Sequence, residues 1–291
     1  MNTEALLLVL SAALCWGAAQ TIAKLGLARM DLVSYASIRA GFALLLIVPY
    51  GLLVHGFRFT DWGLVGMAAF AGLIDSFFGT LLYMVAIKRT EAHAAAALSN
   101  TAPFWGVTTA VLFLGEPARW VTFAAALLVI IGAYLLITPA RADPYPRSLR
   151  SGLGALGAAV LWGVGETGPA KYCLAHGMSP VEFQLVLVGT AAASWWALNL
   201  GTRAHRRRYL SRAGVGYALF TAVTGFFLGW ILWLSGLQLA EASVLTPIKG
   251  GAMTLFAFVI SIVMLRERPS SRAFLGAALA TAGVVLVSLG T

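Results

Sequence analysis

Asp75, Glu166 and Lys249 are ionisable side chains that lie within long apolar stretches of the chain. Charged groups are costly inside a lipid bilayer, and they usually face a protein-lined or water-filled space and serve a function there. Lys249 lies about seven residues from the start of its stretch and Glu166 about six from the end of its own, so at 1.5 Å per residue we expect similar depths. They form either a fixed ion pair that sets helix register or a site for a substrate's charges or a proton. Asp75 is either functional or a protonated group bonded to a neighbouring helix.

Trp16 and Trp162 are each followed by glycine, and each lies near the middle of an apolar stretch. Tryptophan in membrane proteins usually anchors at the interface between lipid and water. Two indoles at midplane depth predict opposite walls of a central cavity, and the alternative is helix packing in which the glycines allow close approach. Gln20 and Glu166 follow the two tryptophans at the same spacing, which indicates that the two regions are related.

Proline is expected to interrupt two of the stretches. Residues 99–103, Ser-Asn-Thr-Ala-Pro, combine turn-forming residues with a proline that removes a backbone hydrogen bond, and Pro247 is expected to break the helix just before Lys249. Freed backbone groups are tolerated at membrane depth only inside a bundle or beside water. Both breaks therefore predict protein-enclosed surroundings.

The elements that carry these residues are long apolar helices. Of the 291 residues, 60% are hydrophobic and 11% charged, and the mean hydropathy is +0.86, whereas about a quarter of residues are charged in soluble proteins. The stretches reach the ~20 residues of a membrane-spanning helix and are too long and too little alternating for barrel strands. We therefore expect an all-α integral membrane protein with ten transmembrane helices, over residues 5–27, 33–54, 63–87, 92–114, 120–138, 152–172, 180–200, 214–238, 242–265 and 272–290.

The chain is duplicated. About 150 residues separate Glu91-Ala92 from the matching Glu241-Ala242, and Leu114-Gly-Glu116 from the matching Leu265-Arg-Glu267. Residues 1–138 and 152–291 are predicted to form two five-helix repeats, joined by a linker at 139–151. Because five is an odd number, the second repeat inserts upside down. Inverted repeats are typical of secondary transporters, whose substrate site lies near the midplane where the halves meet.

The basic residues predict how the chain is oriented in the membrane. The net charge of +9 is compatible with an anionic partner such as nucleic acid, but most basic residues lie in the loops after odd-numbered spans, which favours topology as the cause. The positive-inside rule then puts these loops in the cytoplasm and both termini outside. These loops hold Arg29, Lys88, Arg89, Arg141, Arg147, Arg150, Arg203, Arg206, Arg207, Arg208, Arg212, Arg266, Arg268 and Arg272, and the other side holds Arg58 and Arg119, with Lys171 at a boundary.

The sequence offers no motif for catalysis or metal binding. It contains no HExxH, no Gly-rich phosphate loop and no GxSxG in a strand-turn-helix setting. The histidines, at positions 55, 93, 176 and 205, are scattered over loops and span ends, and Cys15 and Cys173 lie in apolar spans without paired spacing. We therefore expect no enzymatic activity, no cofactor and no metal.

These features together resemble the EamA-type transporters of the drug/metabolite transporter superfamily, over nearly the whole chain. The resemblance rests on the two five-span units, the Trp-Gly pairs, Arg39 in the second span, and Leu-Phe-Leu-Gly-Glu-Pro at 112–117 with its echo Leu-Arg-Glu-Arg-Pro at 265–269. The sequence departs from the family pattern at Met253, where the match of Pro103 is expected. Family members are also commonly drawn with both termini in the cytoplasm, whereas the arginine distribution puts them outside.

The resemblance implies a helical bundle around a central cavity, in the plasma membrane and specifically a bacterial inner membrane. It also implies export of small metabolites or amino acids by alternating access, and one branch of the family exports aromatic amino acids. Carried over by position, Trp16, Tyr83, Trp105, Trp162 and Trp233 are candidate walls, with Asn100 and Lys249 as polar contacts. The whole expected substrate-binding set is Trp16, Gln20, Asp75, Tyr83, Asn100, Trp105, Trp162, Glu166, Trp233 and Lys249.

The expected function is that of a secondary transporter, an exporter of small metabolites such as amino acids. Two alternatives remain open at this point: a carrier of phosphate-containing substrates such as nucleotide sugars or lipid-linked groups, and an intramembrane enzyme that uses Glu166 or Asp75 as acid or base. The expected partners are a small-molecule substrate and membrane lipids, with no nucleic acid. Ten spans can enclose a cavity alone, so a monomer is the default and a dimer the alternative.

Overall fold

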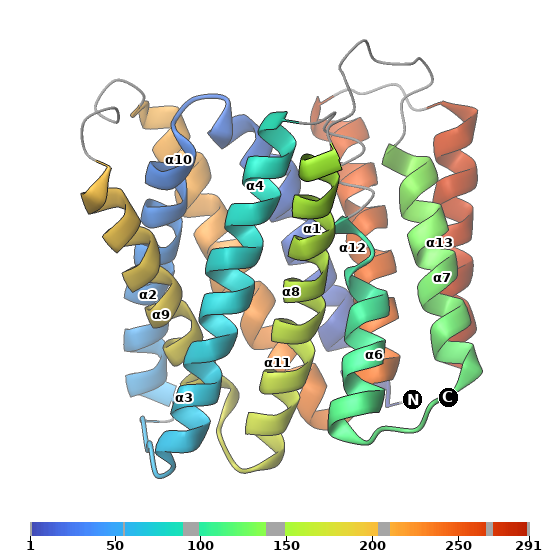
Figure 1. Ribbon diagram of the computed structural model, residues 1–291, viewed down its shortest axis with the longest axis horizontal. Helices are drawn as coiled ribbons and strands as arrows, with labels where there is room; N and C mark the ends of the chain where they lie inside the picture. The colour runs from blue at the N-terminus through green and yellow to red at the C-terminus, as the bar shows by residue number, and fades with distance from the viewer. Residues whose placement is uncertain are drawn as a thin grey trace.

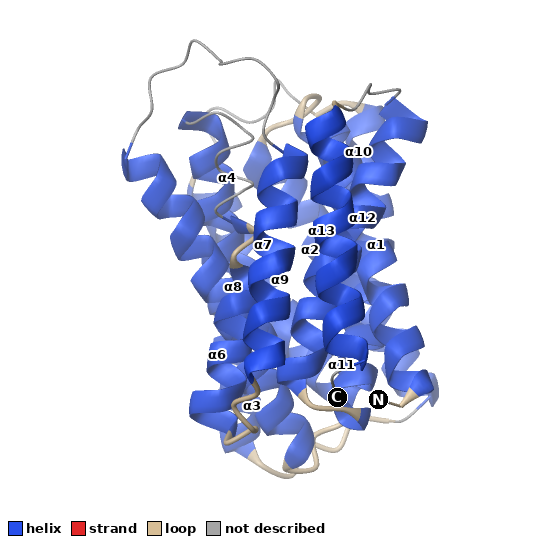
Figure 2. Ribbon diagram, turned by 90° about the vertical axis from the view of Figure 1, so that its right-hand side faces the viewer, coloured by secondary structure: helices blue, strands red, loops and turns tan. Residues whose placement is uncertain are grey.

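The computed structural model describes residues 2–54, 56–89, 99–137, 149–202, 210–265 and 270–289. Within these ranges the regular structure is entirely helical, as the sequence predicts (Figure 2). The helices stand side by side in one bundle, and the start of the first and the end of the last lie at the same end of it (Figure 1). Residues 139–148 of the expected linker lie outside the described residues. The first residues of the span expected at 92–114 and the arginine-rich loop at 203–209 also lie outside them.

The helix boundaries agree with the predicted spans to within a few residues wherever both ends are described. The helices are α1 (Thr3–Leu27), α2 (Leu32–Val54), α3 (Trp62–Ala71), η1 (Gly72–Gly79), α4 (Thr80–Arg89), α6 (Ala102–Leu114), α7 (Trp120–Ile137), α8 (Leu149–Ala175), α9 (Pro180–Gly201), α10 (Arg212–Thr221), η3 (Ala222–Gly229), α11 (Trp230–Leu239), α12 (Ala242–Leu265) and α13 (Ser271–Leu289).

Seven helical segments in the described ranges are long and apolar enough to cross a membrane. They are Thr3–Leu27, Leu32–Val54, Trp62–Ala86, Pro180–Gly201, Arg212–Leu239, Ala242–Met264 and Ser271–Leu289, and Ala102–Leu114 and Trp120–Leu135 are shorter apolar helices. The chain is therefore a multi-pass membrane protein. The count of ten crossings stays a prediction.

Two of the expected continuous helices contain a π-helical segment in the middle. η1 lies between α3 and α4, and η3 lies between α10 and α11. The two segments are eight residues long and occupy matching places in the two halves of the sequence, with Asp75 of η1 at the position of Gly225 in η3. π-Helical turns are rare and are found mostly at functional sites. Hydropathy does not report the hydrogen-bond pattern, so the sequence did not predict them.

The two expected proline breaks have different outcomes. Pro103 lies in the first turn of α6 after a turn at Asn100 and Thr101, so the chain is interrupted there as predicted. Pro247 lies inside α12, which continues through it, so the predicted break before Lys249 is wrong. Pro247 is the sixth residue of α12, beyond the first four, whose N–H groups have no intrahelical partner in any helix. Its missing N–H therefore costs about one hydrogen bond, which the helix tolerates.

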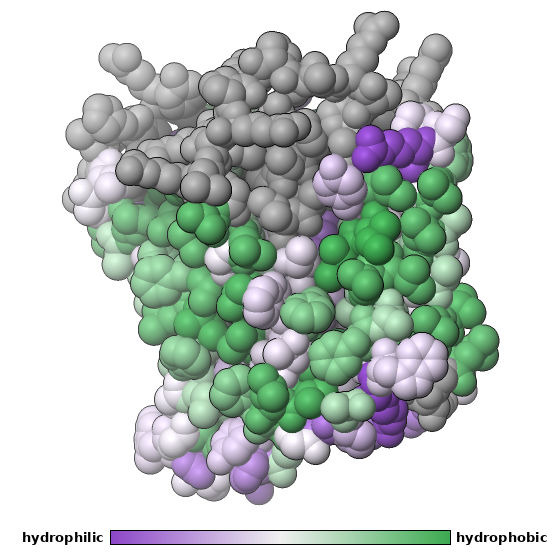
Figure 3. Space-filling view, turned by 45° about the vertical axis from the view of Figure 1, so that its right-hand side comes forward, coloured by the Kyte–Doolittle hydropathy of each residue, from purple (hydrophilic) through white to green (hydrophobic). Residues whose placement is uncertain are grey.

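The surface of the bundle is that of a protein surrounded by lipid. A broad apolar band covers the middle of the face seen in Figure 3, and polar residues gather toward both ends. Trp62 and Trp120, the first residues of α3 and α7, are 76% and 75% exposed. Tryptophan at helix ends is typical of the interface between lipid and water. Both residues thus lie at the end of the bundle that holds the termini.

α7 and α13 pack closely because small residues line their contact. A Cβ atom added at Gly132 of α7 would lie 2.5 Å from the backbone nitrogen of Ala280 and 2.6 Å from the carbonyl oxygen of Gly276. One added at Gly283 of α13 would lie 2.8 Å from the carbonyl oxygen of Ala125. Helices in membranes associate through such close backbone approach, since lipid gives no hydrophobic drive between them.

We predict that Gly132→Leu lowers the thermal unfolding midpoint in detergent, because the added side chain separates α7 from α13 at a cost of about 1–3 kcal/mol. Gly66→Leu is the matched control, since no atom lies within 4 Å of a Cβ built at Gly66. Equal unfolding midpoints for the two variants would contradict the close contact.

Candidate functional site

Lys249 and Glu166 form an ion pair between α12 and α8. The side chain of Lys249 is 7% exposed and that of Glu166 is 17% exposed, so the pair is largely removed from solvent. The similar depth expected from the sequence is therefore confirmed by contact. A buried charge needs its opposite close by, because the cost of removing it from water exceeds what a distant charge returns.

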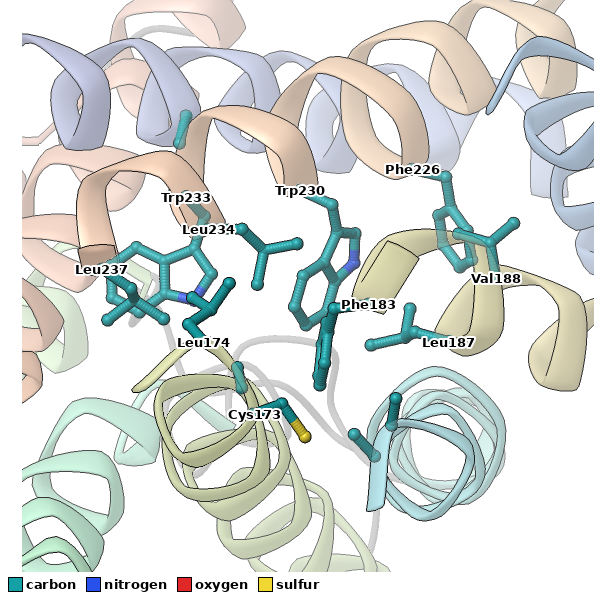
Figure 4. Packing of buried hydrophobic residues seen from close by; sticks show 14 of the residues in the cluster. Cys173, Leu174, Phe183, Leu187, Val188, Phe226, Trp230, Trp233, Leu234 and Leu237 are labelled. Carbon is teal, nitrogen blue, oxygen red and sulfur yellow. The ribbon is translucent and has the colours of Figure 1, made fainter. Parts of the chain in front are cut away.

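Two tryptophans surround the ammonium group of this pair. Lys249 Nζ lies 5.1 Å from the ring centroid of Trp16 and 4.7 Å from that of Trp233, within the range of cation–π attraction. The indole N–H of Trp233 donates to the backbone carbonyl of Glu166 over 2.9 Å. Figure 4 shows Trp233 packed beside Leu237 and Leu174, which fix the ring in place. Trp233 therefore holds both partners of the pair.

Trp16 and Trp162 each donate a hydrogen bond to a π-helix of the other half of the chain. The Trp16 indole N–H reaches the carbonyl oxygen of Gly225 in η3 over 2.9 Å, and that of Trp162 reaches the carbonyl oxygen of Asp75 in η1 over 3.2 Å. Because Gly225 and Asp75 are equivalent positions, the two contacts are reciprocal. A π-helix hydrogen-bonds from i to i+5, and the Asp75 carbonyl accepts the N–H of Thr80 in this way in addition to the indole of Trp162.

The glycine after each tryptophan has a separate role. A Cβ added at Gly17 would lie 2.9 Å from the carbonyl oxygen of Met253 in α12, and one added at Gly163 would lie 2.6 Å from that of Ala102 in α6. Each Trp-Gly pair therefore ties its helix to two elements of the other half. The tryptophan donates a hydrogen bond to the π-helix, and the absence of a side chain at the glycine lets the adjacent helix pack closely.

A pocket of about 100 Å³ lies between α1, α8, α12 and the start of α6. Equivalent residues of the two halves both line it: Trp16 and Trp162, and Gln20 and Glu166. The register that pairs Glu91 with Glu241 also pairs Ser99 with Lys249. The pocket is lined by Trp16, Gln20, Ser99, Asn100, Ala102, Pro103, Trp162, Glu166, Lys249, Gly250 and Met253.

Six of the ten residues expected to bind substrate lie on this pocket. They are Trp16, Gln20, Asn100, Trp162, Glu166 and Lys249. Trp233 contributes through its contact with Lys249, and the ring of Tyr83 lies 5.2 Å from that of Trp162, tilted by 55°. Trp105 donates from its indole to the hydroxyl of Thr101 over 3.3 Å and is not among the lining residues.

Asp75 lies behind the pocket wall. Its side chain is 4% exposed, and its Oδ1 accepts a hydrogen bond from the Ser76 hydroxyl over 2.8 Å. Its Oδ2 has no hydrogen-bond partner among the residues that the structure describes. Arg39 Nε also lacks a partner within the described ranges, and the Arg39 guanidinium lies over the ring of Phe226 at 4.3 Å.

Glu116 has a role that the repeated Leu-Gly-Glu motif indicated but did not explain. Its carboxylate accepts hydrogen bonds from the backbone N–H groups of Ala242 and Ser243, each over 2.8 Å. These groups belong to the first turn of α12, where unpaired donors and the helix dipole favour an anion. Arg119 and Glu241 form an ion pair beside this cap. The loop after α6 thus fixes the helix that carries Lys249.

The pocket residues that sequence reasoning did not single out for binding are Ser99, Ala102, Pro103, Gly250 and Met253. A signal for two of them was present, because Ser99 is the repeat equivalent of Lys249 and Pro103 that of Met253. Gly250 has no side chain to signal chemistry. A Cβ added there would lie 2.3 Å from the ring of Pro103, so its role is to let α12 pass close to α6.

Comparison with known proteins places this architecture among transporters. The model of the EamA-like transporter family matches residues 3–138 and again 150–289. An uncharacterized transporter of Archaeoglobus fulgidus is 34% identical over 109 residues, which is 38% of this chain and 37% of the relative. A protein of known crystal structure covers 99% of this chain with 98% of its own, at a TM-score of 0.82 and 17% identity, and so shares the fold.

We predict that removing one partner of the buried pair is worse than removing both. Lys249→Met or Glu166→Leu alone leaves an uncompensated charge and is expected to cost about 3–5 kcal/mol of unfolding free energy. The double variant leaves no charge and is expected to lose less than either single variant. Denaturant unfolding of the purified proteins measures all three, and losses that simply add would show that the charges are not paired.

We also predict that Gly229→Ala weakens the contact between Trp16 and η3. A Cβ at Gly229 would lie 2.8 Å from the indole nitrogen of Trp16, so the ring must shift away from the Gly225 carbonyl. The loss of this buried hydrogen bond is expected to cost about 1–3 kcal/mol of stability. Gly216→Ala in the same span is the control, because nothing lies within 4 Å of its added Cβ, and an equal loss there would refute the contact.

Proposed function

The chain belongs to the EamA-like transporter family, and on this basis we propose that it is a secondary transporter that exports small amino acids or similar amphipathic metabolites. The observation that carries the proposal is the pocket between the two halves of the chain, in which the Lys249–Glu166 pair is exposed to a small enclosed space. Membership of a transporter family also favours transport over intramembrane catalysis.

The charges of the pocket suit a zwitterion. Glu166 offers a negative charge for an α-amino group, and Lys249 offers a positive charge for an α-carboxylate. A substrate carrying both can replace the internal pair without leaving a buried charge unmatched, which is the costly alternative. Among the described residues of the first half, the polar groups on the pocket are the neutral ones of Gln20, Ser99 and Asn100, which suit a polar side chain of the substrate.

The size of the pocket favours a small substrate. Its volume of about 100 Å³ is small beside the ~300–1,000 Å³ that is typical of ligand pockets. The rings of Trp16 and Trp162 form walls on which the apolar part of a substrate can stack.

A phosphate-containing substrate has less support. Lys249 is the only basic residue among the described residues that line the pocket, and Glu166 already binds it. Phosphate recognition usually employs several charge-assisted donors, often the fork of an arginine. A phosphate here would meet one cation and one anion.

For the mechanism, we propose ten spans in two inverted five-span units, residues 1–138 and 152–291, that rock about the pocket as in other transporters of this plan. The reciprocal Trp-Gly contacts would act as the surfaces on which the halves move. Arg212 and Arg272 start helices at the end of the bundle opposite the termini (Figure 1), and the positive-inside rule makes that end cytoplasmic. A monomer in the plasma membrane is sufficient for this cycle.

The test is exchange in proteoliposomes that contain the purified protein and unlabelled L-threonine, L-phenylalanine or glucose 6-phosphate, with the same compound labelled outside. We predict exchange of threonine, and a loss of about tenfold or more in Lys249→Ala, since each 1.4 kcal/mol of lost binding is a factor of ten. Lys24→Ala is the control, because Lys24 is an exposed lysine in the last turn of α1.

Exchange of threonine by Lys249→Ala at the wild-type rate would show that the pocket is not the substrate site. Exchange of glucose 6-phosphate alone would replace the amino-acid proposal with that of a phosphate carrier.

A further inference from the structure

Asp75 is a buried acid that the proposed substrate site does not use. One of its carboxyl oxygens accepts from Ser76, and the other has no partner in the described part of the chain. A charged carboxylate with an unpaired oxygen is expensive to keep out of water, and such a group normally takes up a proton instead. Because Ser76 donates to Oδ1, the proton belongs on Oδ2.

Asp75 is also next to the ion pair in space. Its backbone carbonyl accepts the indole N–H of Trp162, and a Cβ added at Gly165 would lie 2.8 Å from the Cβ of Asp75. Gly165 directly precedes Glu166, so Asp75 packs on the same turn of α8 that carries the acidic partner of Lys249. The charges of Lys249 and Arg39 both act on Asp75 electrostatically.

The other groups around Asp75 make this a small cluster of two acids and two bases. α2 contributes Arg39 and Tyr35, α4 contributes Tyr83, α8 contributes Glu166 and α12 contributes Lys249. α3 carries no acidic or basic residue, and the one on α9 is Glu182, which accepts from the backbone N–H of Arg58 near the end of the bundle. Lys249 is the cation that binds Glu166, and its side chain is a flexible stem that can turn.

We infer that Asp75 is the proton-loading site that couples transport to a proton gradient, with Lys249 moving between Glu166 and Asp75. The inference rests on the proposed function. In the conformation described, Lys249 binds Glu166 and Asp75 holds the proton. When the amino group of a substrate takes Glu166, Lys249 leaves Glu166, binds the substrate's carboxylate and turns toward Asp75, where its charge also stabilises the Asp75 carboxylate.

The step balances as a simple proton transfer. The O–H bond of Asp75 breaks, its electron pair stays on the carboxylate, and the proton passes to water on the side to which the pocket is open. After the substrate leaves on the opposite side, Lys249 returns to Glu166 and Asp75 takes a proton from water there. One substrate thus moves outward as one proton moves inward.

The first experiment needs no substrate. Infrared spectra of the purified protein at neutral pH are expected to contain the carbonyl stretch of a protonated carboxylic acid, shifted by exchange into D₂O. This band is expected to disappear in Asp75→Asn and to remain in Glu4→Gln, an exposed acid in the first turn of α1. The absence of the band from the wild-type protein, or its full intensity in Asp75→Asn, would overturn the inference.

The second experiment separates coupling from transport. In proteoliposomes with an acidic lumen, wild-type protein is expected to accumulate labelled threonine. Asp75→Asn, in which the amide keeps the size and the acceptor for Ser76, is expected still to exchange threonine but to reach only equal concentrations inside and outside. Accumulation by Asp75→Asn would refute its coupling role. A wild-type protein that exchanges no threonine would instead refute the proposed substrate, and the infrared result would still decide the protonation.

Discussion

A backbone carbonyl at membrane depth must find a donor within the protein, because lipid offers none. The two π-helical segments displace carbonyls from the regular ladder at two equivalent places, and the indoles of Trp16 and Trp162 each donate to one of these carbonyls from the opposite half of the chain. This reciprocal exchange sets where α1 and α8 lie against η3 and η1. The pocket lies between these two hydrogen-bonded contacts. The positions of its walls and its approximate symmetry therefore follow from the contacts.

Because the chain is duplicated, the helices around the pocket are arranged symmetrically. The side chains that line it differ between the two halves. Where the second half has Glu166 and Lys249, the first half has Gln20 and Ser99. Where η3 has Gly225, η1 has Asp75. The acidic and basic groups at the site thus sit at positions whose repeat partners are neutral, so the two halves can keep one backbone plan while only one side of the pocket carries charge.

Much of this was predictable from the sequence, for identifiable reasons. Ionisable residues in apolar stretches are rare enough that Lys249 and Glu166 stood out, and counting residues from the span ends placed them at one depth. The matching motifs revealed the repeats, and hydropathy located most helix ends. The π-helices and the passage of α12 through Pro247 could not be read this way, because both depend on which tertiary partner satisfies a backbone group. The distinction between Trp16 as a wall and Trp105 as a packing residue depends on helix rotation, which hydropathy does not report when both faces of a helix are apolar.

The cap that Glu116 forms on α12 joins the membrane surface to the pocket. Lys249 lies two helical turns from the capped residues, about 10 Å along a rigid element. Beside the cap, the side chains of Arg119 and Glu241 are each 36% exposed, so dissolved ions weaken their attraction, whereas the Lys249–Glu166 pair is too deeply buried for such screening. Added salt therefore weakens the Arg119–Glu241 pair at the start of α12 and leaves the attraction between Lys249 and Glu166 nearly unchanged.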